Sequence, residues 1–282
     1  MQAQQYDRIE TLAGGAKVQH GPYNDRIYLM QTGPGPLQEL PQRLIGMAED
    51  KGYGKIFAKL PEVRASVFLN AGFRTEAEIP AFYNEKEKGV FLAYYVNRDR
   101  ENEADLDIYE HNRTLALSKK HTKISPLDAS RFRLRTCNED DTTHMAEIYK
   151  VVFPSYPFPI HDPDYLRETL RTHVDYFGVE HKGKLIALSS AEKNTKALHA
   201  EMTDFATLPD WRGNGLAVHL LLRMEEHVRR RGFRNVFTIA RAASPGMNIT
   251  FAKCGYEYGG RLINNTNISG NIESMNIWYK PL

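Results

Sequence analysis

One segment of the chain recurs later in the sequence. With a constant offset of 180 residues, "LPQRLIGMAEDKGYGKIFAKL" (40–60) lies under "LLLRMEEHVRRRGFRNVFTIA" (220–240), with a glycine in step. After a shift of three residues, "FLNAGF" (68–73) matches "FAKCGY" (251–256). Two amphipathic helices can resemble each other by chance, but here the glycines and the following strands also coincide. The recurring order helix–Gly–strand–helix–Gly–strand therefore indicates an internal repeat, which limits the fold to two similar halves.

The bulk composition is that of a globular protein long enough for two cores. The chain has 282 residues, 26% charged and 41% hydrophobic, and a formal net charge of +2, which gives no case for nucleic acid or an anionic membrane. The basic run 229–231 ends a predicted helix, where cations offset the helix dipole. Without a secretory signal or a long apolar run, we expect a cytoplasmic protein. Two isolated cysteines predict neither a disulfide framework nor a metal site.

We divide the chain into a degenerate N-terminal copy (1–110), a polar linker (111–130) and a functional domain (131–282). Strand and helix patterns alternate through the last of these. We expect strands near 131–137, 175–192 (a hairpin), 197–208, 235–241, 256–263 and 273–279, and helices near 138–153, 163–172, 215–231 and 245–254. The asparagine-rich "INNTNISGN" is expected to be a loop between the last two strands.

The stretch "LPDWRGNGLA" (208–217) places an arginine and two glycines between a strand pattern and a helix pattern. Such a loop directs unpaired N–H groups and the positive end of a helix dipole at one point, which suits a phosphate. A P-loop is excluded because no Gly-Lys-Ser/Thr follows, and a dinucleotide fingerprint because Val218 replaces its third glycine. The pattern that remains is Arg-x-x-Gly-x-Ala, formed by Arg212, Gly215 and Ala217.

The repeat places "TGPGPL" (32–37) under "RGNGLA" (212–217). The first copy keeps both glycines but has Thr32 for the arginine, and its prolines have no N–H to donate. We therefore expect the N-terminal loop to bind no cofactor.

The second loop and its flanks resemble the GCN5-related N-acetyltransferase (GNAT) superfamily. That superfamily has Arg/Gln-x-x-Gly-x-Gly/Ala between its fourth strand and third helix, and "TDFATLPDWRGNGLA" and "FAKCGY" stand at matching places. The resemblance covers residues 131–282. It implies an α/β (α+β) fold with a mixed, mostly antiparallel twisted sheet and flanking helices, preceded here by a degenerate GNAT-like half.

The resemblance also implies a site for acetyl-CoA, the co-substrate. The pantetheine arm would lie where the fourth and fifth strands splay apart, along Phe205, Ala206 and Thr207, with Ser244 where relatives have an asparagine. Backbone N–H groups there would also stabilise the oxyanion of acyl transfer. These strand residues would be buried whether or not they bind the arm. The pyrophosphate would be held by the loop residues Arg212, Gly213, Asn214, Gly215, Leu216 and Ala217.

A general base is needed because an amine is nucleophilic only when it is neutral. Glu201 stands on the fourth strand where many relatives have a catalytic glutamate, although it could equally be a surface charge or a partner for the substrate amine. Strand alternation places Glu201 on one face and Asp204 on the other. The superfamily's usual acid, a tyrosine, is replaced by Phe251, so we assign no general acid. A thiol can leave as thiolate without one.

The tail "TIARAASPGMNITFAKCGYEYGGRLINNTNISGNIESMNIWYKPL" (238–282) and "YPFPIHDPDYL" (156–166) resemble the beta-lysine N6-acetyltransferases. That resemblance implies acetylation of the ε-amine of β-lysine, which a lysine 2,3-aminomutase supplies, to make a compatible solute for osmoprotection. Arginine could hold the carboxylate, asparagines and a glutamate the 3-ammonium, and aromatic rings the stem. Each residue type also has a purely structural explanation: asparagines favour turns, aromatic rings next to prolines pack, and an arginine can form a salt bridge. The candidates are Arg241, Asn264, Asn265, Asn267, Glu273, Tyr156 and Phe158.

Two other functions remain open from the sequence. One is acetylation of a different diamine, a polyamine or a protein N-terminus. The other is a non-catalytic acyl-CoA-binding regulator, which the phenylalanine at position 251 would allow but the retained Arg212, Gly215 and Glu201 disfavour. The sequence does not decide whether the chain forms a homodimer.

Overall fold

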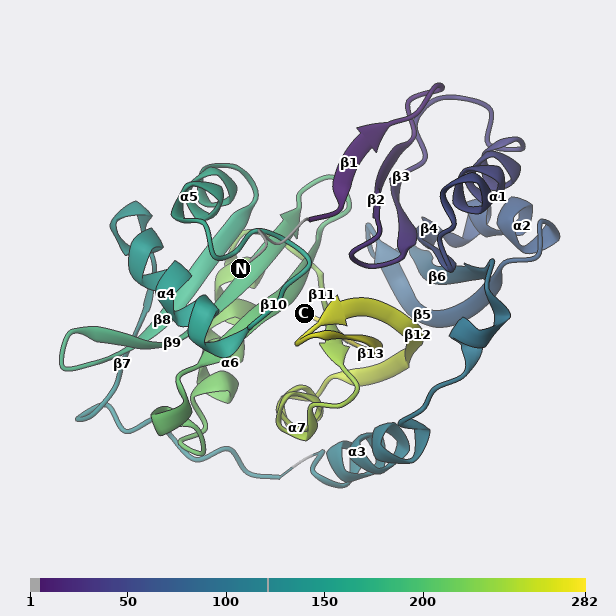
Figure 1. The fold of residues 1–282 in the computed structure, drawn as a ribbon. Helices are drawn as coiled ribbons and strands as arrows, with labels where there is room; N and C mark the ends of the chain where they lie inside the picture. The colour runs from purple at the N-terminus through teal and green to yellow at the C-terminus, as the bar shows by residue number, and fades with distance from the viewer. Residues whose placement is uncertain (1–5, 121) are drawn as a thin grey trace.

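The computed structural model describes residues 6–120 and 122–282. Strands and helices alternate along most of this length (Figure 1). The strands are β1 (Arg8–Thr11), β2 (Lys17–Gly21), β3 (Arg26–Gln31), β4 (Lys55–Pro61), β5 (Arg74–Tyr83), β6 (Glu87–Tyr95), β7 (Arg133–Thr136), β8 (Val174–His181), β9 (Lys184–Asn194), β10 (His199–Thr207), β11 (Asn235–Arg241), β12 (Glu257–Ile268) and β13 (Asn271–Pro281). The α-helices are α1 (Leu40–Lys51), α2 (Glu62–Asn70), α3 (Leu106–Ser118), α4 (Thr142–Val152), α5 (Pro163–Thr172), α6 (Leu216–Arg230) and α7 (Pro245–Lys253).

The strands form one continuous sheet in the order β1-β2-β3-β4-β6-β5-β12-β13-β11-β10-β9-β8-β7. The two halves of this sheet have the same plan, read inward from each outer edge. Antiparallel strands lead to a parallel pair, β3–β4 in the first half and β10–β11 in the second, and two antiparallel strands follow. The halves are joined where β5 pairs with β12. The mixed, mostly antiparallel sheet predicted from the sequence is confirmed.

The internal repeat is present in the backbone as well as in the sequence. Strand β4 covers residues 55–61 and β11 covers 235–241, so both ends differ by the same 180 residues. Each is preceded by a helix that ends next to a left-handed glycine, Gly52 in the first half and Gly232 in the second. Glycine takes this conformation without the Cβ penalty that other residues incur.

Helices cover the two halves of the sheet differently. In the N-terminal half, α1 and α2 pack on one face around Leu44, Ile56 and Phe68. In the C-terminal half, α6 and α7 cover one face, while α4 and α5 cover the other. The core beneath α4 and α5 also includes residues of the N-terminal half, so that it contains both Phe82 and Phe237. The second face of the N-terminal half is thus turned toward the face of the C-terminal half that α4 and α5 share.

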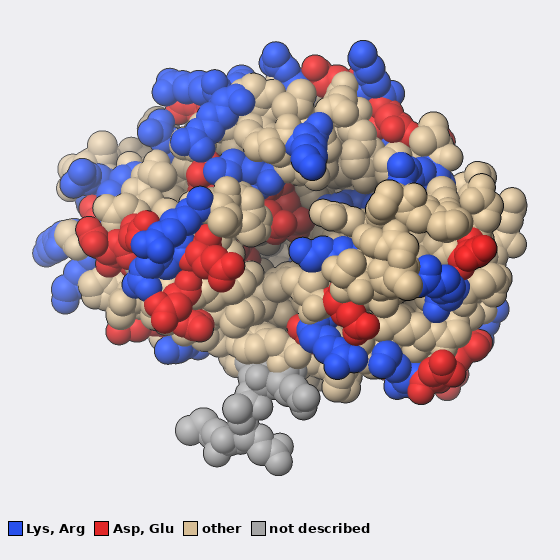
Figure 2. Space-filling view, turned by 90° about the horizontal axis from the view of Figure 1, so that it is seen from above, with Lys and Arg blue, Asp and Glu red and all other residues tan. Residues whose placement is uncertain are grey.

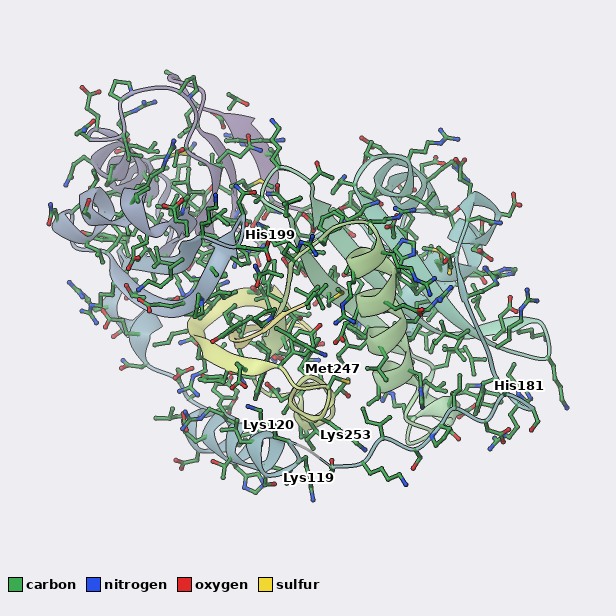
Figure 3. The ribbon with its side chains drawn as sticks, turned by 180° about the vertical axis from the view of Figure 1, so that it is seen from behind. Lys119, Lys120, His181, His199, Met247 and Lys253 are labelled. Carbon is green, nitrogen blue, oxygen red and sulfur yellow. The ribbon has the colours of Figure 1, made fainter. Side chains whose placement is uncertain are left out.

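Helix α3 crosses the expected boundary at residue 110 and packs against α7. Asn112 donates through its side-chain amide to the Ala242 carbonyl at 3.0 Å, and Arg261 of β12 pairs with Glu110. Figure 3 shows Lys119 and Lys120, at the end of α3, near Lys253 of α7. The first part of the predicted linker is therefore a packed helix.

The asparagine-rich segment was predicted to be a loop, and this is wrong. Residues 264–268 belong to β12, and a short turn leads to β13 at Asn271. The pairing with β13 shifts register between Leu262 and Thr266, and Asn264 has a φ of 43°. Asparagine tolerates this left-handed conformation better than most residues. The composition that suggested a turn thus marks a β-bulge inside a strand.

Candidate active site

The glycine loop at residues 212–215 is open to solvent and leads directly into α6. Gly215 is the N-cap of α6 with a φ of 71°, and Gly213 has a φ of 81°. A Cβ built on either glycine would meet no other atom within 4 Å. The first N–H groups of a helix have no acceptor within that helix. The loop therefore offers free amides and clearance at a positive helix end, which fits a pyrophosphate.

The flanks of this loop hold its shape. Arg212 is exposed and lines the cavity described below, and its Nε donates to the Thr207 carbonyl at 3.3 Å. Asn214 bonds back to the Trp211 carbonyl at 3.0 Å and does not line the cavity described below. Ser244 precedes α7 and does line it.

Strands β10 and β11 pair over only three residues and then separate. The last pair is Glu201 with Phe237, although β10 continues to Thr207 and β11 to Arg241. Phe205 and Thr207 line the space that opens between the strands, while Ala206 is buried beneath it. Such a gap leaves strand-edge backbone groups free to bond an extended ligand.

A cavity of about 1290 Å³ joins these features to the N-terminal half. It extends from the glycine loop through the gap between the strands to a region enclosed by both halves. Figure 2 shows the corresponding face of the molecule hollowed near its middle, with acidic side chains inside and basic side chains around the rim. Both an elongated cofactor and a small acceptor can be accommodated in a space of this size.

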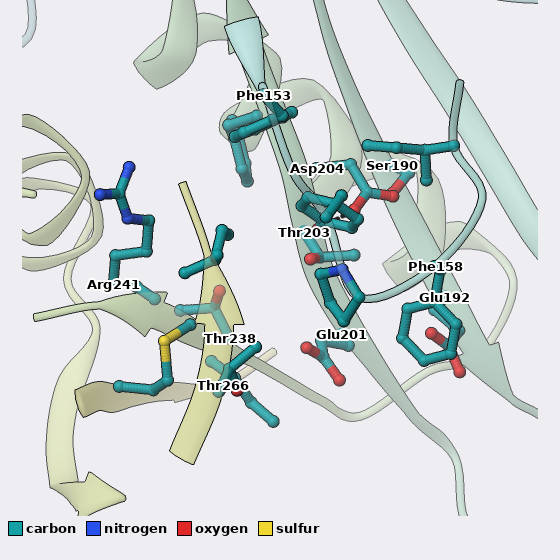
Figure 4. Close-up of a pocket in the computed structure, with 18 of the residues that line it drawn as sticks. Phe153, Phe158, Ser190, Glu192, Glu201, Thr203, Asp204, Thr238, Arg241 and Thr266 are labelled. Carbon is teal, nitrogen blue, oxygen red and sulfur yellow. Dashed lines mark hydrogen bonds between the residues drawn. The ribbon is translucent and has the colours of Figure 1, made fainter. Parts of the chain in front are cut away.

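Three carboxylates lie on the β9–β10 wall of this cavity: Glu192, Glu201 and Asp204 (Figure 4). Glu192 and Glu201 are direct cross-strand partners. The prediction that Asp204 faces away from Glu201 is wrong. The β10 register shifts between Thr203 and Ala206, and Asp204 has a φ of 54°, so a bulge breaks the alternation and returns Asp204 to the cavity.

The electrostatics of this wall favour a proton on Glu201. Burial, together with the nearby Glu192 and Asp204 carboxylates, raises the pKa of Glu201 to about 8, against the opposing effect of Lys59. Burial opposes the charge of Lys59 itself, but Tyr28 and the Glu201 carboxylate outweigh it and raise the pKa of Lys59 above its ordinary value. Glu201 thus has the character of a general base that works near neutral pH.

The two aromatic candidates line the acceptor end of the cavity. Tyr156 is buried and its hydroxyl donates to the Asp204 carboxylate, which also accepts from Ser190. Burial raises the pKa of Asp204, and these hydrogen bonds act in the opposite direction. Phe158 is half-buried and lines the cavity together with Glu192 (Figure 4). Both rings come from the proline-rich segment before α5, whose prolines fix an irregular path over the cavity.

Arg241 and Glu273 are paired with each other. The Arg241 Nε and Nη2 atoms donate to the two Glu273 oxygens at 2.9 and 2.6 Å. Arg241 lines the cavity and Glu273 does not. In Figure 4, Arg241 lies across the gap from the three carboxylates. The two-pronged contact that Arg241 could give to a substrate carboxylate is therefore already made within the chain.

The three asparagine candidates lie in different surroundings. Asn265 is buried and lines the cavity, and its side-chain oxygen has no hydrogen-bond partner. Asn264 donates to the carbonyls of Arg100 and Asn102, each at 2.9 Å, and Asn267 donates to the Tyr23 carbonyl at 2.8 Å. Asn264 and Asn267 therefore attach β12 to the N-terminal half.

The sequence analysis missed an entire wall of the cavity, which the N-terminal half supplies. Alternate residues of neighbouring strands share one sheet face, and here that face turns toward Glu201. Arg26, Tyr28 and Met30 follow this spacing in β3, and Phe57 and Lys59 in β4. A charged residue at an alternating position of an apolar strand, as in "KIFAKL", was the available signal.

Two further residues, Phe251 and His199, are buried aromatic side chains that pack around the site. Phe251, at the position of the superfamily's acid, packs edge-on against Phe205 with 5.6 Å between ring centroids, and Tyr256 lies behind it. Tyr256 does not line the cavity. His199 is buried where the halves meet (Figure 3), stacked on Phe82 at 4.1 Å. Burial lowers the pKa of His199 to about 2, so this ring is a neutral packing element.

Taken together, the open glycine loop at a helix start, the diverging parallel strands and the glutamate beside them define a GNAT acetyltransferase. Residues 143–256 match the model of the acetyltransferase (GNAT) family. The chain belongs to this family of N-acetyltransferases, whose members use acetyl-CoA.

Curated relatives match nearly the whole chain. It is 38% identical to the beta-lysine N(6)-acetyltransferase of Methanococcus maripaludis over 93% of this chain and 95% of the relative. It is 31% identical to that of Methanosarcina mazei over 88% and 98%, respectively. The N-acetyltransferase YodP of Bacillus subtilis is 30% identical over 95% and 96%. The similarity thus includes the N-terminal half. Among the residues described, no helix has the length and apolar character needed to cross a membrane.

Proposed function

We propose that this protein transfers the acetyl group of acetyl-CoA to the ε-amine of β-lysine (3,6-diaminohexanoate). The product would be N6-acetyl-β-lysine. Two relatives named beta-lysine N(6)-acetyltransferase support this assignment because their similarity covers both halves of the chain. A substrate-specific pocket built from both halves would require similarity of that extent.

The observation that carries the proposal is the single cavity that connects the glycine loop to the carboxylate wall. Gly215 and Ser244 line its cofactor end, and Glu201 and Tyr156 line its acceptor end. The open space around the glycines and the gap beside Phe205 fit a pyrophosphate and an extended arm. Acetyl-CoA supplies an activated acyl group with a thiol leaving group.

Glu201 acts in this proposal as the general base. An ε-ammonium has an ordinary pKa of about 10.4, so it must lose a proton before it can attack. With its pKa raised to about 8, Glu201 is a stronger base than an exposed carboxylate and can accept that proton. The adjacent Asp204 and Glu192 carboxylates attract the two ammonium groups of a diamine into the cavity.

The remaining steps use backbone and packing. Free strand-edge groups at Phe205 and Thr207 hold the acyl carbonyl and stabilise the charge that develops on its oxygen. Phe251 has no proton to donate, so the sulfur leaves as thiolate, which its moderate basicity permits. The rings of Tyr156 and Phe158 cover the aliphatic stem and limit access of water.

The same proposal has a physiological side. N6-Acetyl-β-lysine is neutral overall and would serve as a compatible solute for osmoprotection. Such a protein would work in the cytoplasm, downstream of a lysine 2,3-aminomutase that supplies β-lysine. These consequences follow only if β-lysine is the acceptor, so the assay of acceptor specificity tests their premise.

The test is release of free thiol from acetyl-CoA by the purified protein. We expect the largest kcat/KM with β-lysine, with smaller values for α-lysine and spermidine and none for a peptide amine. Mass spectrometry of the product would locate the acetyl group on the ε-nitrogen. A larger kcat/KM with spermidine would establish a polyamine acetyltransferase instead. Acetyl-CoA binding without thiol release from any amine would leave only a regulatory role.

A further inference from the structure

Three buried cations of the N-terminal half bond to consecutive carbonyls in the β12 bulge. Lys55 donates to the Ile263 carbonyl at 2.6 Å, Arg100 to the Asn264 carbonyl at 2.9 Å, and Arg26 to the Asn265 carbonyl. Their exposed fractions are 0%, 8% and 6%, respectively. This arrangement fixes the N-terminal half to the strand that borders the cavity.

Only two of these three cations have a carboxylate partner among the described residues. Lys55 pairs with Glu76 at 2.9 Å, and Arg100 pairs with Asp25. Arg26 forms no ion pair in the described parts of the chain: its Nη1 bonds to the Asn265 carbonyl and to Thr266 Oγ1, and its Nε is buried without any partner. A buried charge is costly to leave uncompensated. Arg26 thus differs from its two neighbours by lacking a directly bonded carboxylate: its guanidinium lies over the rings of Tyr28 and Phe57, and Asp7 favours its charge only from beyond ion-pair distance.

Arg26 is also the one of the three that lines the cavity. Asp7 lines the cavity as well, but its oxygens accept from the backbone of Tyr23 and from the backbone and side chain of Asn24, at 2.7 to 3.2 Å. Asp7 is therefore held in place by other donors rather than by Arg26. Arg26 and the adjoining Asn265 both line the cavity, and the Arg26 Nε and the Asn265 Oδ1 have no hydrogen-bond partner.

The distance along β3 matches a short amino acid. Tyr28 lies two residues from Arg26 on the same sheet face, which is ~6.6 Å along a strand. Tyr28 and Lys59 both interact electrostatically with Glu201, so they lie at the base end of the cavity. An extended six-carbon diamino acid spans about 7 Å between its terminal nitrogen and its carboxyl carbon. The length of such a ligand is comparable to the spacing between Arg26 and the part of β3 that faces Glu201.

We infer that Arg26, from the N-terminal half, binds the carboxylate of the acceptor and makes the enzyme select diamino acids over simple diamines. This inference deepens the proposed function and depends on it. The C-terminal half would then supply the acidic wall that receives the ammonium groups, and the N-terminal half the cation that receives the carboxylate. Arg241 is less suited to this role, because its Nε and Nη2 atoms already donate to Glu273.

The experiment compares each acceptor with its decarboxylated form. Wild-type protein and Arg26→Gln are assayed with β-lysine and with 1,4-diaminopentane, which is β-lysine without its carboxylate. Removing one partner of a buried charged hydrogen bond is expected to lower kcat/KM for β-lysine by roughly 30-fold or more. The value for 1,4-diaminopentane and the KM for acetyl-CoA should change by less than about threefold. Arg98→Gln is the control, because it removes an arginine of the same half that is 71% exposed.

Equal losses with both acceptors would overturn the inference, since they would indicate a structural role for Arg26. An unchanged kcat/KM for β-lysine would overturn it as well. If Arg26→Gln does not fold, Arg26→Lys keeps the positive charge but loses the planar fork. It should lower kcat/KM for β-lysine about tenfold and spare 1,4-diaminopentane; equal changes would again exclude the inference.

Failure of the proposed function gives a different result. In that case the wild-type protein would not acetylate β-lysine at all. α-Lysine and 1,5-diaminopentane also differ only by a carboxylate. Comparing kcat/KM for these two acceptors in wild-type protein and Arg26→Gln would then still test whether Arg26 binds a carboxylate. A preference for α-lysine that disappears in Arg26→Gln would support the carboxylate site with another substrate. If the wild-type protein shows no preference for α-lysine over 1,5-diaminopentane either, both the proposed function and the role of Arg26 are excluded.

Discussion

The glycine loops at 32–37 and 212–217 occupy equivalent positions in the two halves of the chain, but the space beside their glycines is filled in the first loop and open in the second. Gly215, in the second loop, has open space where a Cβ would point. At Gly33, in the first loop, a Cβ would lie 2.3 Å from the backbone of Gly15. Gly35 donates to the Gly14 carbonyl at 2.9 Å. A turn of the chain therefore fills the first loop, while the second stays open to a ligand.

The strands behind these loops show the same divergence. Glu201 of β10 is paired with Phe237, and Tyr28 of β3 is paired with Phe57, which is 180 residues earlier. Tyr28 thus takes the place of the base in the N-terminal copy. Both side chains line one cavity. In the N-terminal half the loop is filled and a tyrosine stands where Glu201 stands in the other half, but the sheet plan is the same, and one face of that sheet lines the cavity.

The largest effect is expected at the open loop. Gly215→Glu would put a carboxylate where we place a pyrophosphate, and like charges in close contact cost several kcal/mol. We expect acetyl-CoA affinity to fall on the order of 100-fold or more, measured by calorimetry. Gly215→Ala is the matched control because it adds only the strain of a φ of 71°. If Gly215→Glu bound acetyl-CoA normally, the loop would have no part in cofactor binding.

The next largest effect is expected at Glu201, which we propose as the general base and which Tyr28 replaces at the equivalent position of the N-terminal half. Glu201→Gln should lower kcat by about 10²- to 10⁴-fold without changing acetyl-CoA binding, because it removes the base. In the wild type, kcat/KM should rise with pH through about 8, since Glu201 must lose its proton to act. That rise should disappear in the variant. A pH profile unchanged by Glu201→Gln would assign the base to another group.

Local patterns in the sequence were enough to predict the features that depend on local geometry. The loop at 212–217, the strand that carries Glu201 and most element positions follow from glycine placement and periodicity. Asp204 and the 264–268 segment were misplaced because a β-bulge interrupts alternation without leaving a periodic signal. Arg26 could not be assigned and Lys59 left only the weak signal of a charge in an apolar strand, because the role of each depends on how one half of the sheet faces the other.

The filled loop should affect stability and not catalysis. Gly33→Ala forces a Cβ into the Gly15 backbone and is expected to lower Tm by about 5 °C. Gly213→Ala is the matched control, since it has a similar positive φ but open space; it should lower Tm less. The KM for acetyl-CoA should be unchanged in Gly33→Ala. A raised KM there would show that the first loop still contributes to the cofactor site.

The smallest effect is expected at Lys59, the cation of the N-terminal half that influences the pKa of Glu201. Lys59 corresponds to Ile239 in the repeat, and both residues line the cavity. Lys59 lowers the pKa of Glu201, against burial and the neighbouring carboxylates. Lys59→Met should therefore move the acidic limb of the kcat/KM profile to higher pH. At saturating substrate and high pH, kcat should be close to that of the wild type, because Glu201 is then deprotonated in both proteins. A limb that stays in place would mean that the N-terminal half encloses the pocket without tuning its base.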